Sequence, residues 1–467
     1  MLFSSISFIY YFLAASLIIY FIVPFKFKNL VLLVASLAFY FYGEPVYTLL
    51  MLGTALSSYI HGLLIDHFRG RKLAKVFLWS SVITSVLVLG FFKYSDFFIS
   101  NVNNIFNTKI SLLGLALPIG ISFYTFQTLS YTIDVYRGEA AVQKSFIRLA
   151  TYVTLFPQLI AGPIVRYTTV EEELSNRKHS FENFSYGVNR FIIGLGKKVL
   201  IADTLYSMAT SLHTMNEASV GGMWLYAIAI SLYTYFDFSG YSDMAIGLGR
   251  IFGFHFLENF NYPFISRNVA EFWRRWHISL GSWFRDYIYI PLGGNRVPVL
   301  RWMFNVLVVW FLTGFWHGAD WTFIVWGLYF ALFLVLEKFV LNKFFAKLPR
   351  FFSHIYVTVA IIISFVIFHG AGMSGAVSDL GSMFGAGNLP IWSGETTYTL
   401  ISYIFVLLIA IVGATPLIKN AVLKLKENEK VCRVINVLEP VFHIAVLLIA
   451  TAYFVDGSFS PFLYFRF

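Results

Sequence analysis

The stretch Leu312-Thr-Gly-Phe-Trp-His-Gly-Ala-Asp-Trp321 lies between two long apolar runs of the chain. An apolar helix is predicted over 301–315 and a second over 321–337, because both runs approach the roughly 20 residues that cross the hydrocarbon core of a bilayer. The chain turns back between them. The stretch therefore predicts two membrane helices with His317 at their junction.

The rest of the chain has the same character. Of its 467 residues, 58% are hydrophobic and only 12% are charged, and the mean hydropathy is +0.71. Soluble domains carry about 25% charged residues. Cys432 is the single cysteine, which excludes a disulfide within the chain. The pattern predicts an all-α polytopic membrane protein with about 11 transmembrane helices, plus shorter re-entrant or interfacial helices. The other apolar runs lie near 2–24, 29–42, 46–64, 76–92, 111–133, 150–165, 222–250, 352–371, 398–417 and 436–455.

Lysine and arginine gather in a few loops, and short cytoplasmic loops of membrane proteins are enriched in these residues. The loops at 67–75, 338–350 and 419–433 are basic, whereas 372–397 contains no lysine or arginine. The basic loops are therefore expected in the cytoplasm, with the loop at 372–397 and both termini outside. The chain has a net charge of +10. Membrane topology accounts for the distribution of its basic residues, which argues against a nucleic-acid partner.

Three polar stretches interrupt the apolar runs. Pro118–Gln127 and Phe156–Pro163 contain helix breakers, and irregular backbone at membrane depth is tolerated only where it is buried in protein or lines a cavity. Tyr235–Asp243 contains two carboxylates, and a charge at mid-bilayer costs about 2.5–3.5 kcal/mol. Asp237 and Asp243 are therefore expected to be interior, and paired or facing water. They either brace helices or line a reaction chamber.

The segment 267–301 contains six arginines and only two acids, which excludes an ordinary span. Four of its side chains recur at helical spacing and should share one face: Trp273, His277, Leu280 and Phe284. This pattern predicts a short helix at the cytoplasmic boundary. The helix either anchors the chain in the interface or forms a basic, aromatic-lined mouth for an anionic donor such as a nucleotide-bearing thioester. The second alternative makes five residues candidates for donor binding: Arg274, Arg275, Arg285, Trp273 and Trp276.

Two histidines are candidates for catalysis. The ordinary pKa of a histidine, about 6.5, suits proton transfer near neutral pH, although a hydrogen-bonded structural role is the alternative for His317. His277 and His317 are expected on opposite sides of one span, so they should not form a metal pair, and no other His/Cys cluster suggests zinc. Neither a metal site nor a permanently bound cofactor is predicted.

Two motifs resemble the signature of the membrane-bound O-acyltransferase superfamily. The first runs from Phe272-Trp-Arg-Arg-Trp-His277 to Arg296, and the second is Phe315-Trp-His-Gly318. The three polar stretches and the ending Ser460–Phe467 are similar to the bacterial AlgI-like branch, which takes part in O-acetylation of alginate and other polysaccharides. The related DltB-like proteins of teichoic acid D-alanylation typically differ after the first motif, which favours acetyl transfer.

The resemblance implies a single membrane domain over 1–467, with helices in a ring around a central tunnel. Peripheral spans would cover 1–92, the catalytic core about 111–337 and the C-terminal spans 352–467. The family's second motif makes His317 the catalytic histidine, and His277 takes the variable position of the first motif. Six side chains are expected to line the tunnel: Asp237, Ser239, Ser242, Asp243, Gln127 and Trp316.

The resemblance also implies an acyltransferase of the bacterial cytoplasmic membrane. It would take an acetyl group from cytoplasmic acetyl-CoA for O-acetylation of an extracytoplasmic polysaccharide, with His317 as general base or as transient acyl carrier. A periplasmic or surface SGNH-type acetyltransferase is the expected partner. The alternatives are D-alanyl transfer to teichoic acid, transport of an acyl donor and, with less support, a membrane scaffold.

Overall fold

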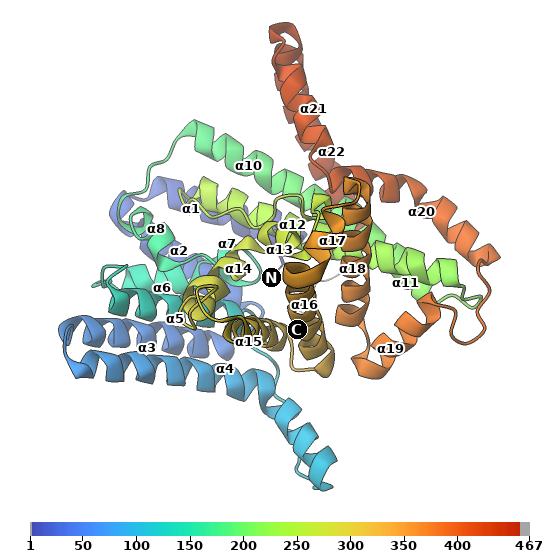
Figure 1. Ribbon diagram of the computed structural model, residues 1–467. Coiled ribbons are helices and arrows are strands. Elements are labelled where there is room, and N and C mark those ends of the chain that lie inside the picture. Colours follow the sequence, from blue (N-terminus) through green and yellow to red (C-terminus); the bar gives the residue numbers. More distant parts are fainter. Residues whose placement is uncertain (1, 458–467) are drawn as a thin grey trace. The chain divides into compact units, whose positions relative to one another are not determined.

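The computed structural model describes residues 2–457, which form helices and connecting segments without a strand (Figure 1). The chain divides into two compact units. Unit 1 comprises Met1–Phe191 and Ser242–Leu257, and unit 2 comprises Ile192–Tyr241 and Glu258–Phe467. The helix α12 (Val220–Ile251) contributes its first part to unit 2 and its last part to unit 1.

Unit 1 contains the N-terminal helices. They are η1 (Ser7–Leu13), α1 (Ala14–Ile22), α2 (Phe25–Phe41), α3 (Tyr47–His67), α4 (Lys72–Phe106), α5 (Ile121–Arg137), α6 (Phe146–Thr154), α7 (Phe156–Leu159), α8 (Tyr167–Val170), α9 (Glu173–Asn176) and most of α10 (Phe181–Gly196). The helices α3, α4 and α5 pack against one another, and Figure 1 shows α3 and α4 side by side in blue. A second contact joins α2 to α6.

Two breaks in unit 1 coincide with the predicted helix breakers. The helix α5 begins only after Gly120, whose φ of +75° is in the left-handed region that favours glycine. The helix α7 has four residues, and the chain continues from 160 to 166 without regular helix while 156–165 stays buried. The prediction of irregular backbone buried inside the protein is therefore confirmed for Phe156–Pro163. In the other stretch, Pro118 is buried and Gly120 is half-buried.

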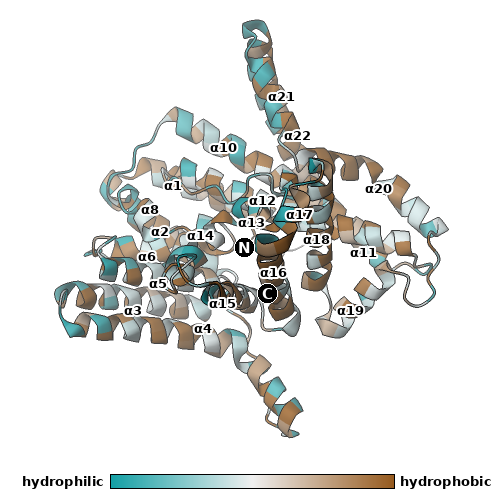
Figure 2. Cartoon of the chain, in the orientation of Figure 1, coloured by the Kyte–Doolittle hydropathy of each residue, from teal (hydrophilic) through white to brown (hydrophobic). Residues whose placement is uncertain are grey.

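Unit 2 contains the remaining helices. They are η2 (Lys197–Ala202), α11 (Asp203–His213), the first part of α12, η3 (Pro263–Ile265), α13 (Val269–Arg275), α14 (Ile278–Phe284), η4 (Arg285–Tyr289), α15 (Val299–His317), α16 (Trp321–Leu336), η5 (Glu337–Leu341), α17 (Asn342–Phe345), α18 (Arg350–His369), α19 (Gly372–Met383), α20 (Gly394–Gly413), α21 (Leu417–Lys426) and α22 (Glu429–Asp456). Figure 2 shows that α16 and α18 are largely apolar, whereas α21 carries many hydrophilic residues.

The hairpin predicted from the opening stretch is confirmed, and its two helices are α15 and α16. They approach closely because glycines face each other where the helices cross. A Cβ on Gly314 would lie 2.2 Å from the carbonyl oxygen of Phe323, and one on Gly327 would lie 2.2 Å from that of Trp310. Small residues at such crossings let helix backbones meet in membrane proteins. The crossing fixes the end of α15 against α16.

Seven helices among residues 2–457 are long and apolar enough to cross a membrane. They are Tyr47–His67, Lys72–Phe106, Val299–His317, Trp321–Phe345, Arg350–His369, Gly394–Gly413 and Glu429–Asp456. Several other predicted spans form shorter helices, since α2 and α5 have 17 residues each and α6 has nine. The all-α, multi-pass membrane class is confirmed, and the number of about 11 spans stays a prediction. The family-like ending Ser460–Phe467 and the predicted external C-terminus lie outside the described residues.

Candidate functional site

The turn between α15 and α16 is short, and its polar side chains fix the helix ends. The helix α15 ends at His317, and Gly318 is extended. Asp320 is the N-cap of α16, because its Oδ1 accepts hydrogen bonds from the backbone N–H and the hydroxyl of Thr322, both at 2.8 Å. His317 therefore occupies the last position of a helix whose end is held against the next one.

The side chain of His317 is surrounded by aromatic rings. Its residue is only 6% exposed, and its imidazole centroid lies 4.9 Å from that of Trp316, 5.0 Å from that of Trp326 and 5.4 Å from that of Phe368. These rings come from α15, α16 and α18. The second family-like motif thus places its histidine in a buried aromatic environment formed by three helices.

His277 forms the junction between α13 and α14. Its φ of +46° and ψ of +53° are left-handed, a conformation that costs a non-glycine residue about 1–2 kcal/mol. Asn259 holds this turn. Its carbonyl accepts the backbone N–H of Ile278 at 3.0 Å, and its Oδ1 accepts the backbone N–H and the hydroxyl of Ser279 at 3.2 and 2.8 Å. Strained backbone of this kind persists where the surroundings enforce it, and it clusters at functional sites.

The predicted single helix at this place is therefore broken in two. Trp276 is extended and His277 is left-handed, so α13 ends at Arg275 and α14 begins at Ile278. Sequence spacing alone does not show this break, because the contact that stabilises it comes from Asn259, a residue outside the segment. The side chains expected on one face nevertheless line one cavity: Trp273, His277, Leu280 and Phe284.

The expectation that His277 and His317 lie on opposite sides of a span was wrong. The ring centroids of His277 and Trp316 are 6.2 Å apart, and those of Trp316 and His317 are 4.9 Å apart. The expectation assumed that the first motif stays at the boundary where α15 begins. Instead, the turn between α13 and α14 places His277, which is 1% exposed, beside the end of α15.

Burial controls the charge of His277. Desolvation lowers the pKa of this histidine from 6.5 to about 3, because a charged imidazolium loses its hydration in the interior. Its Nδ1 lies 3.2 Å from Oδ1 of Asn259. The imidazole is therefore neutral at physiological pH, and one of its ring nitrogens keeps a lone pair that can accept a hydrogen bond.

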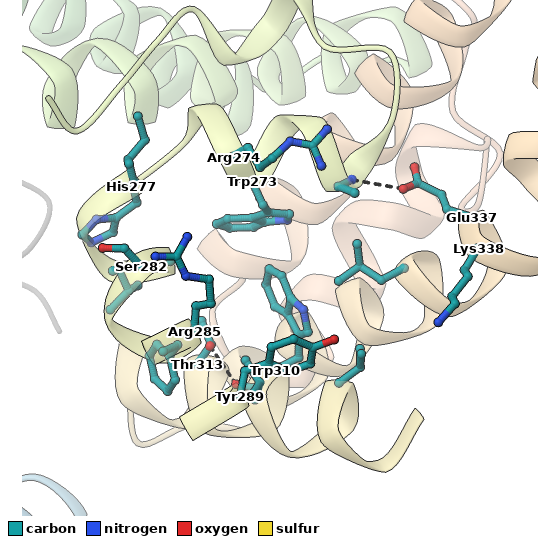
Figure 3. Close-up of a pocket in the computed structure, with 18 of the residues that line it drawn as sticks. Trp273, Arg274, His277, Ser282, Arg285, Tyr289, Trp310, Thr313, Glu337 and Lys338 are labelled. Atoms are coloured by element: carbon teal, nitrogen blue, oxygen red, sulfur yellow. Dashed lines mark hydrogen bonds between the residues drawn. The ribbon is translucent and has the colours of Figure 1, made fainter. Parts of the chain in front are cut away.

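A cavity of about 650 Å³ lies beside His277 (Figure 3). One wall is aromatic, since the indole centroids of Trp273 and Trp310 are 4.7 Å apart. Trp302 extends this wall, and the ammonium of Lys338 lies 3.5 Å from its ring centroid, close enough for a cation–π interaction. The volume falls within the range of small-molecule and cofactor sites, about 300–1,000 Å³.

Positive charge surrounds the cavity at exposed positions. Arg274, Arg285 and Lys338 line it and are exposed, whereas His277 is buried. Charge therefore lies at the rim and the imidazole lies deeper. The guanidinium of Arg285 also makes two hydrogen bonds to Asp286, at 2.7 and 3.2 Å.

Two of the five predicted donor-binding residues lie elsewhere. The guanidinium of Arg275 pairs with Glu271 at 3.0 Å, and Trp276 stacks on Phe272 with ring centroids 5.5 Å apart. Neither is among the residues that line the cavity. The structure brings three of the five to the cavity: Trp273, Arg274 and Arg285.

Glu337 holds the N-terminus of α13 at the cavity. Its carboxylate accepts hydrogen bonds from the backbone N–H groups of Val269 and Ala270, the latter at 3.0 Å, and from the hydroxyl of Tyr356 at 3.1 Å. Figure 3 shows one of these bonds as a dashed line. A carboxylate is favourable at this end of a helix. Glu337 thereby fixes the helix that carries Trp273.

Asp237 and Ser239 belong to the part of α12 in unit 2. Asp237 is fully buried, and its Oδ1 lies 2.7 Å from Nζ of Lys198, which also contacts Oδ1 of Asp203 at 2.7 Å. The prediction of an interior, paired carboxylate is confirmed. Neither Asp237 nor Ser239 lines the cavity, and their tunnel-lining role stays a prediction.

Three further candidates for the tunnel lie in unit 1. Asp243 contacts the guanidinium of Arg190 at 2.7 and 2.9 Å, so its pairing is also confirmed. Ser242 is its buried neighbour, and Gln127 is fully buried in α5. The roles of these three as tunnel residues stay predictions. The sixth candidate, Trp316, is the ring that contacts both histidines.

Several residues of this site were not predicted from the sequence. Asn259 and Glu337 carry no local signal, because their contacts join segments that are distant in the chain. Lys338 was noted only as part of a basic loop and not as a site residue. A helical repeat could have indicated the face of α15 that lines the cavity. Its members are Trp302, Val306, Val309, Trp310 and Thr313.

Comparison with known proteins agrees with these motifs. The family model of the membrane-bound O-acyltransferase family, MBOAT, matches residues 46–378. The "Probable alginate O-acetylase AlgI" of Azotobacter vinelandii is 36% identical over 100% of both chains. The peptidoglycan O-acetyltransferase of Helicobacter pylori is 34% identical over 82% of this chain and 80% of its own. The teichoic acid D-alanyltransferase of Bacillus subtilis is 33% identical over 53% of this chain and 65% of its own.

The matched range contains both histidine motifs and every residue that lines the cavity. It covers more than half of the chain, and relatives with similarity along most of their length carry acyltransferase names. The chain is thus a multi-pass membrane acyltransferase, and it belongs to the membrane-bound O-acyltransferase family.

Proposed function

We propose that this protein takes an acetyl group from cytoplasmic acetyl-CoA and passes it across the bacterial cytoplasmic membrane for O-acetylation of an extracytoplasmic polysaccharide. The observation that carries the proposal is the arrangement at the cavity. Exposed cations surround its rim, His277 lines it at depth, and His317 packs against the same indole as His277.

The cavity suits a nucleotide-bearing thioester. Acetyl-CoA carries phosphates and an adenine ring, and arginine binds phosphate through bidentate, charge-assisted hydrogen bonds. Arg274, Arg285 and Lys338 supply the positive charge, and Trp273 and Trp302 supply flat apolar surfaces. The basic loops at 67–75, 338–350 and 419–433 support a cytoplasmic rim, because Lys338 lies in one of them.

The chemistry requires a group that accepts a proton. The acceptor hydroxyl attacks the thioester carbonyl, a C–O bond forms, the C–S bond breaks, and the thiolate of CoA leaves. His317 is the proposed acceptor of the hydroxyl proton, or it takes the acetyl group first and passes it on. In the second route the hydroxyl attacks acetyl-histidine instead, and the imidazole is the leaving group.

The acceptor is proposed from the relatives. Alginate and peptidoglycan O-acetylation appear in the names of relatives similar along most of this chain, and the D-alanyl relative is similar over a smaller share. This difference supports acetyl transfer to a polysaccharide over D-alanyl transfer to teichoic acid. An SGNH-type acetyltransferase outside the membrane is the proposed partner. A ring of helices with a tunnel would connect the two sides, with both chain termini outside.

Right-side-out proteoliposomes loaded with acetyl-labelled CoA thioester test the proposal. The lumen then takes the place of the cytoplasm, and the polysaccharide with its partner is supplied outside. We expect label on the polysaccharide from wild-type protein and none from His317→Ala. Export of intact acetyl-CoA would instead indicate a transporter. Transfer only from a D-alanyl carrier thioester would indicate the teichoic acid reaction.

A further inference from the structure

The orientation of the Asn259 side chain follows from its contacts. The backbone N–H of Ser279 points at one terminal atom of the side chain, 3.2 Å away. A backbone N–H can only donate, so the atom that it meets must be the amide oxygen and not the amide nitrogen. The hydroxyl of Ser279 donates to the same oxygen at 2.8 Å. Asn259 is fully buried, so the interior holds it in this orientation.

This orientation determines the tautomer of His277. The same oxygen of Asn259 lies 3.2 Å from Nδ1 of the imidazole. Because an amide oxygen can only accept, Nδ1 must carry the hydrogen. A neutral imidazole has one protonated nitrogen and one lone pair, so the lone pair is on Nε2.

The other ring nitrogen of His277, Nε2, makes no hydrogen bond to the described part of the protein. His277 lines the cavity, and this nitrogen is buried. The rings packed on the imidazole are those of Phe238, with centroids 4.7 Å apart, and Trp316. Neither ring is titratable.

We propose that Asn259 is a positioning residue that holds the proton of His277 on Nδ1 and so presents the Nε2 lone pair to the cavity. His277 then accepts a hydrogen bond from the reacting groups at Nε2 and does not donate one there. This inference rests on the proposed function, since it assigns the direction of hydrogen bonding at the same site.

The proposal predicts opposite effects for two substitutions at Asn259. Asn259→Asp keeps an acceptor at Nδ1 and adds a negative charge, which favours the imidazolium. Asn259→Leu has a similar size but removes the acceptor, so the proton can move to Nε2. Partners that orient active histidines in metal sites typically contribute ten- to a hundredfold, and we expect a loss of kcat of about this size in Asn259→Leu.

The tautomer can be read without measuring activity. Solid-state NMR of ¹⁵N-histidine-labelled protein in liposomes separates protonated from unprotonated ring nitrogens, and subtraction of the His277→Asn spectrum isolates this residue. We expect an Nδ1–H tautomer in the wild type and in Ser279→Ala, and a mixture in Asn259→Leu. An Nε2–H tautomer in the wild type, or an unchanged tautomer in Asn259→Leu, would overturn the proposal.

A pH titration of the ¹⁵N signals of His277 gives a second readout. It follows this imidazole itself, whereas the acid limb of kcat/KM would report the essential base, His317. We expect the pKa of His277 to rise by about 1–3 pH units in Asn259→Asp, because a carboxylate within hydrogen-bond distance stabilises the imidazolium. KM for acetyl-CoA should stay near the wild-type value in both Asn259 variants.

Asn305→Leu is the matched control for a merely structural effect. Asn305 is equally buried in unit 2, and its amide donates to the carbonyls of Leu292 and Gly294. The control should lower the yield of folded protein without changing the pKa of His277. An unchanged pKa of His277 in Asn259→Asp would overturn the proposal. If the wild type transfers no acetyl group at all, the proposed function fails, while the NMR result still decides whether Asn259 sets the tautomer.

Discussion

The imidazoles of His277 and His317 pack against one indole, that of Trp316, although the two histidines belong to different motifs. His277 comes from a turn between two short helices, and His317 from the end of a long apolar helix. Only His277 of the two is among the residues that line the cavity. The donor would therefore meet His277 first, with Trp316 and His317 next to it.

This arrangement predicts different results for the two histidines. His317→Ala should abolish acetyl transfer while expression and partner binding stay near wild type. His277→Ala should reduce transfer less severely, because it changes the donor side of the site. Vesicle transfer assays and co-purification with the partner measure both effects. Near-normal transfer by His317→Ala would show that His317 is not the catalytic residue.

The two adjacent arginines of the first motif should behave differently. Arg274 lines the cavity, whereas Arg275 pairs with Glu271. Arg274→Glu should raise KM for acetyl-CoA at least tenfold without changing membrane insertion, because the loss of one charge-assisted phosphate contact removes about 1.5–3 kcal/mol. Arg275→Glu should instead lower thermal stability with little change in KM. Equal KM values for the two variants would favour the alternative in which these arginines only anchor the helix to anionic lipid.

The buried cluster around Lys198 separates the two alternatives for Asp237. Lys198 contacts Asp237 and Asp203, each at 2.7 Å, and removing one partner of a buried pair typically costs about 3–5 kcal/mol. Lys198→Met should therefore lower the free energy of unfolding by about this amount. If Asp237 braces helices, Asp237→Asn should also have a lower free energy of unfolding. The kcat of its folded fraction should then stay within about twofold of wild type.

The exposed pair of Arg433 and Glu429 provides a control. Its side chains are 81% and 92% exposed with a 4.0 Å contact, and such surface pairs contribute little. Arg433→Met should leave the unfolding midpoint unchanged. If Asp237 instead lines a reaction chamber, Asp237→Asn should have normal stability and a large loss of kcat. That result would contradict our expectation.

The local sequence pattern predicted the helices of this fold better than it predicted the contacts between them. The hairpin around His317 followed from two apolar runs, and the pairing of Asp237 followed from the cost of an isolated buried charge. The break at His277 depends on hydrogen bonds from Asn259, and α13 depends on a carboxylate from η5. Periodicity reports which residues share a face of one helix. It gives no information about a partner elsewhere in the chain, so the structural roles of Lys198, Asn259 and Glu337 could not be predicted.

Acid should destabilise unit 1 through His179. Burial and the nearby charges of Lys28 and Arg177 lower the pKa of this histidine to about 4, and its Nε2 lies 2.9 Å from the hydroxyl of Tyr20. Because the unfolded chain binds the proton with a pKa near 6.5, it holds more protons than the native state between these values. Stability should therefore fall as the pH drops from 6.5 towards 4.

Thermal unfolding of the purified protein in detergent, measured at intervals from pH 7 to pH 4.5, checks this expectation. His179→Gln should flatten the dependence, because the substituted side chain does not titrate. The histidine of the cavity contributes in the same direction, since the pKa of His277 is lowered to about 3. A midpoint for wild-type protein that is constant over this range would contradict the assignment of a neutral buried His179.

The proposed orientation can be tested with the native cysteine as an internal reference. Cys432 is the single cysteine, it is partly exposed, and it lies in the basic segment 419–433 that we expect in the cytoplasm. An impermeant maleimide should label wild-type cells at Cys432 only after permeabilisation.

In a Cys432→Ser background, Ala386→Cys should label in intact cells, because residue 386 is exposed and belongs to the loop at 372–397 that contains no basic residue. Ser7→Cys, also at an exposed position, tests the N-terminal side in the same way. Labelling of Cys432 in intact cells together with protection of Ala386→Cys would invert the topology, and the cation-rich rim of the cavity could then not receive a cytoplasmic donor.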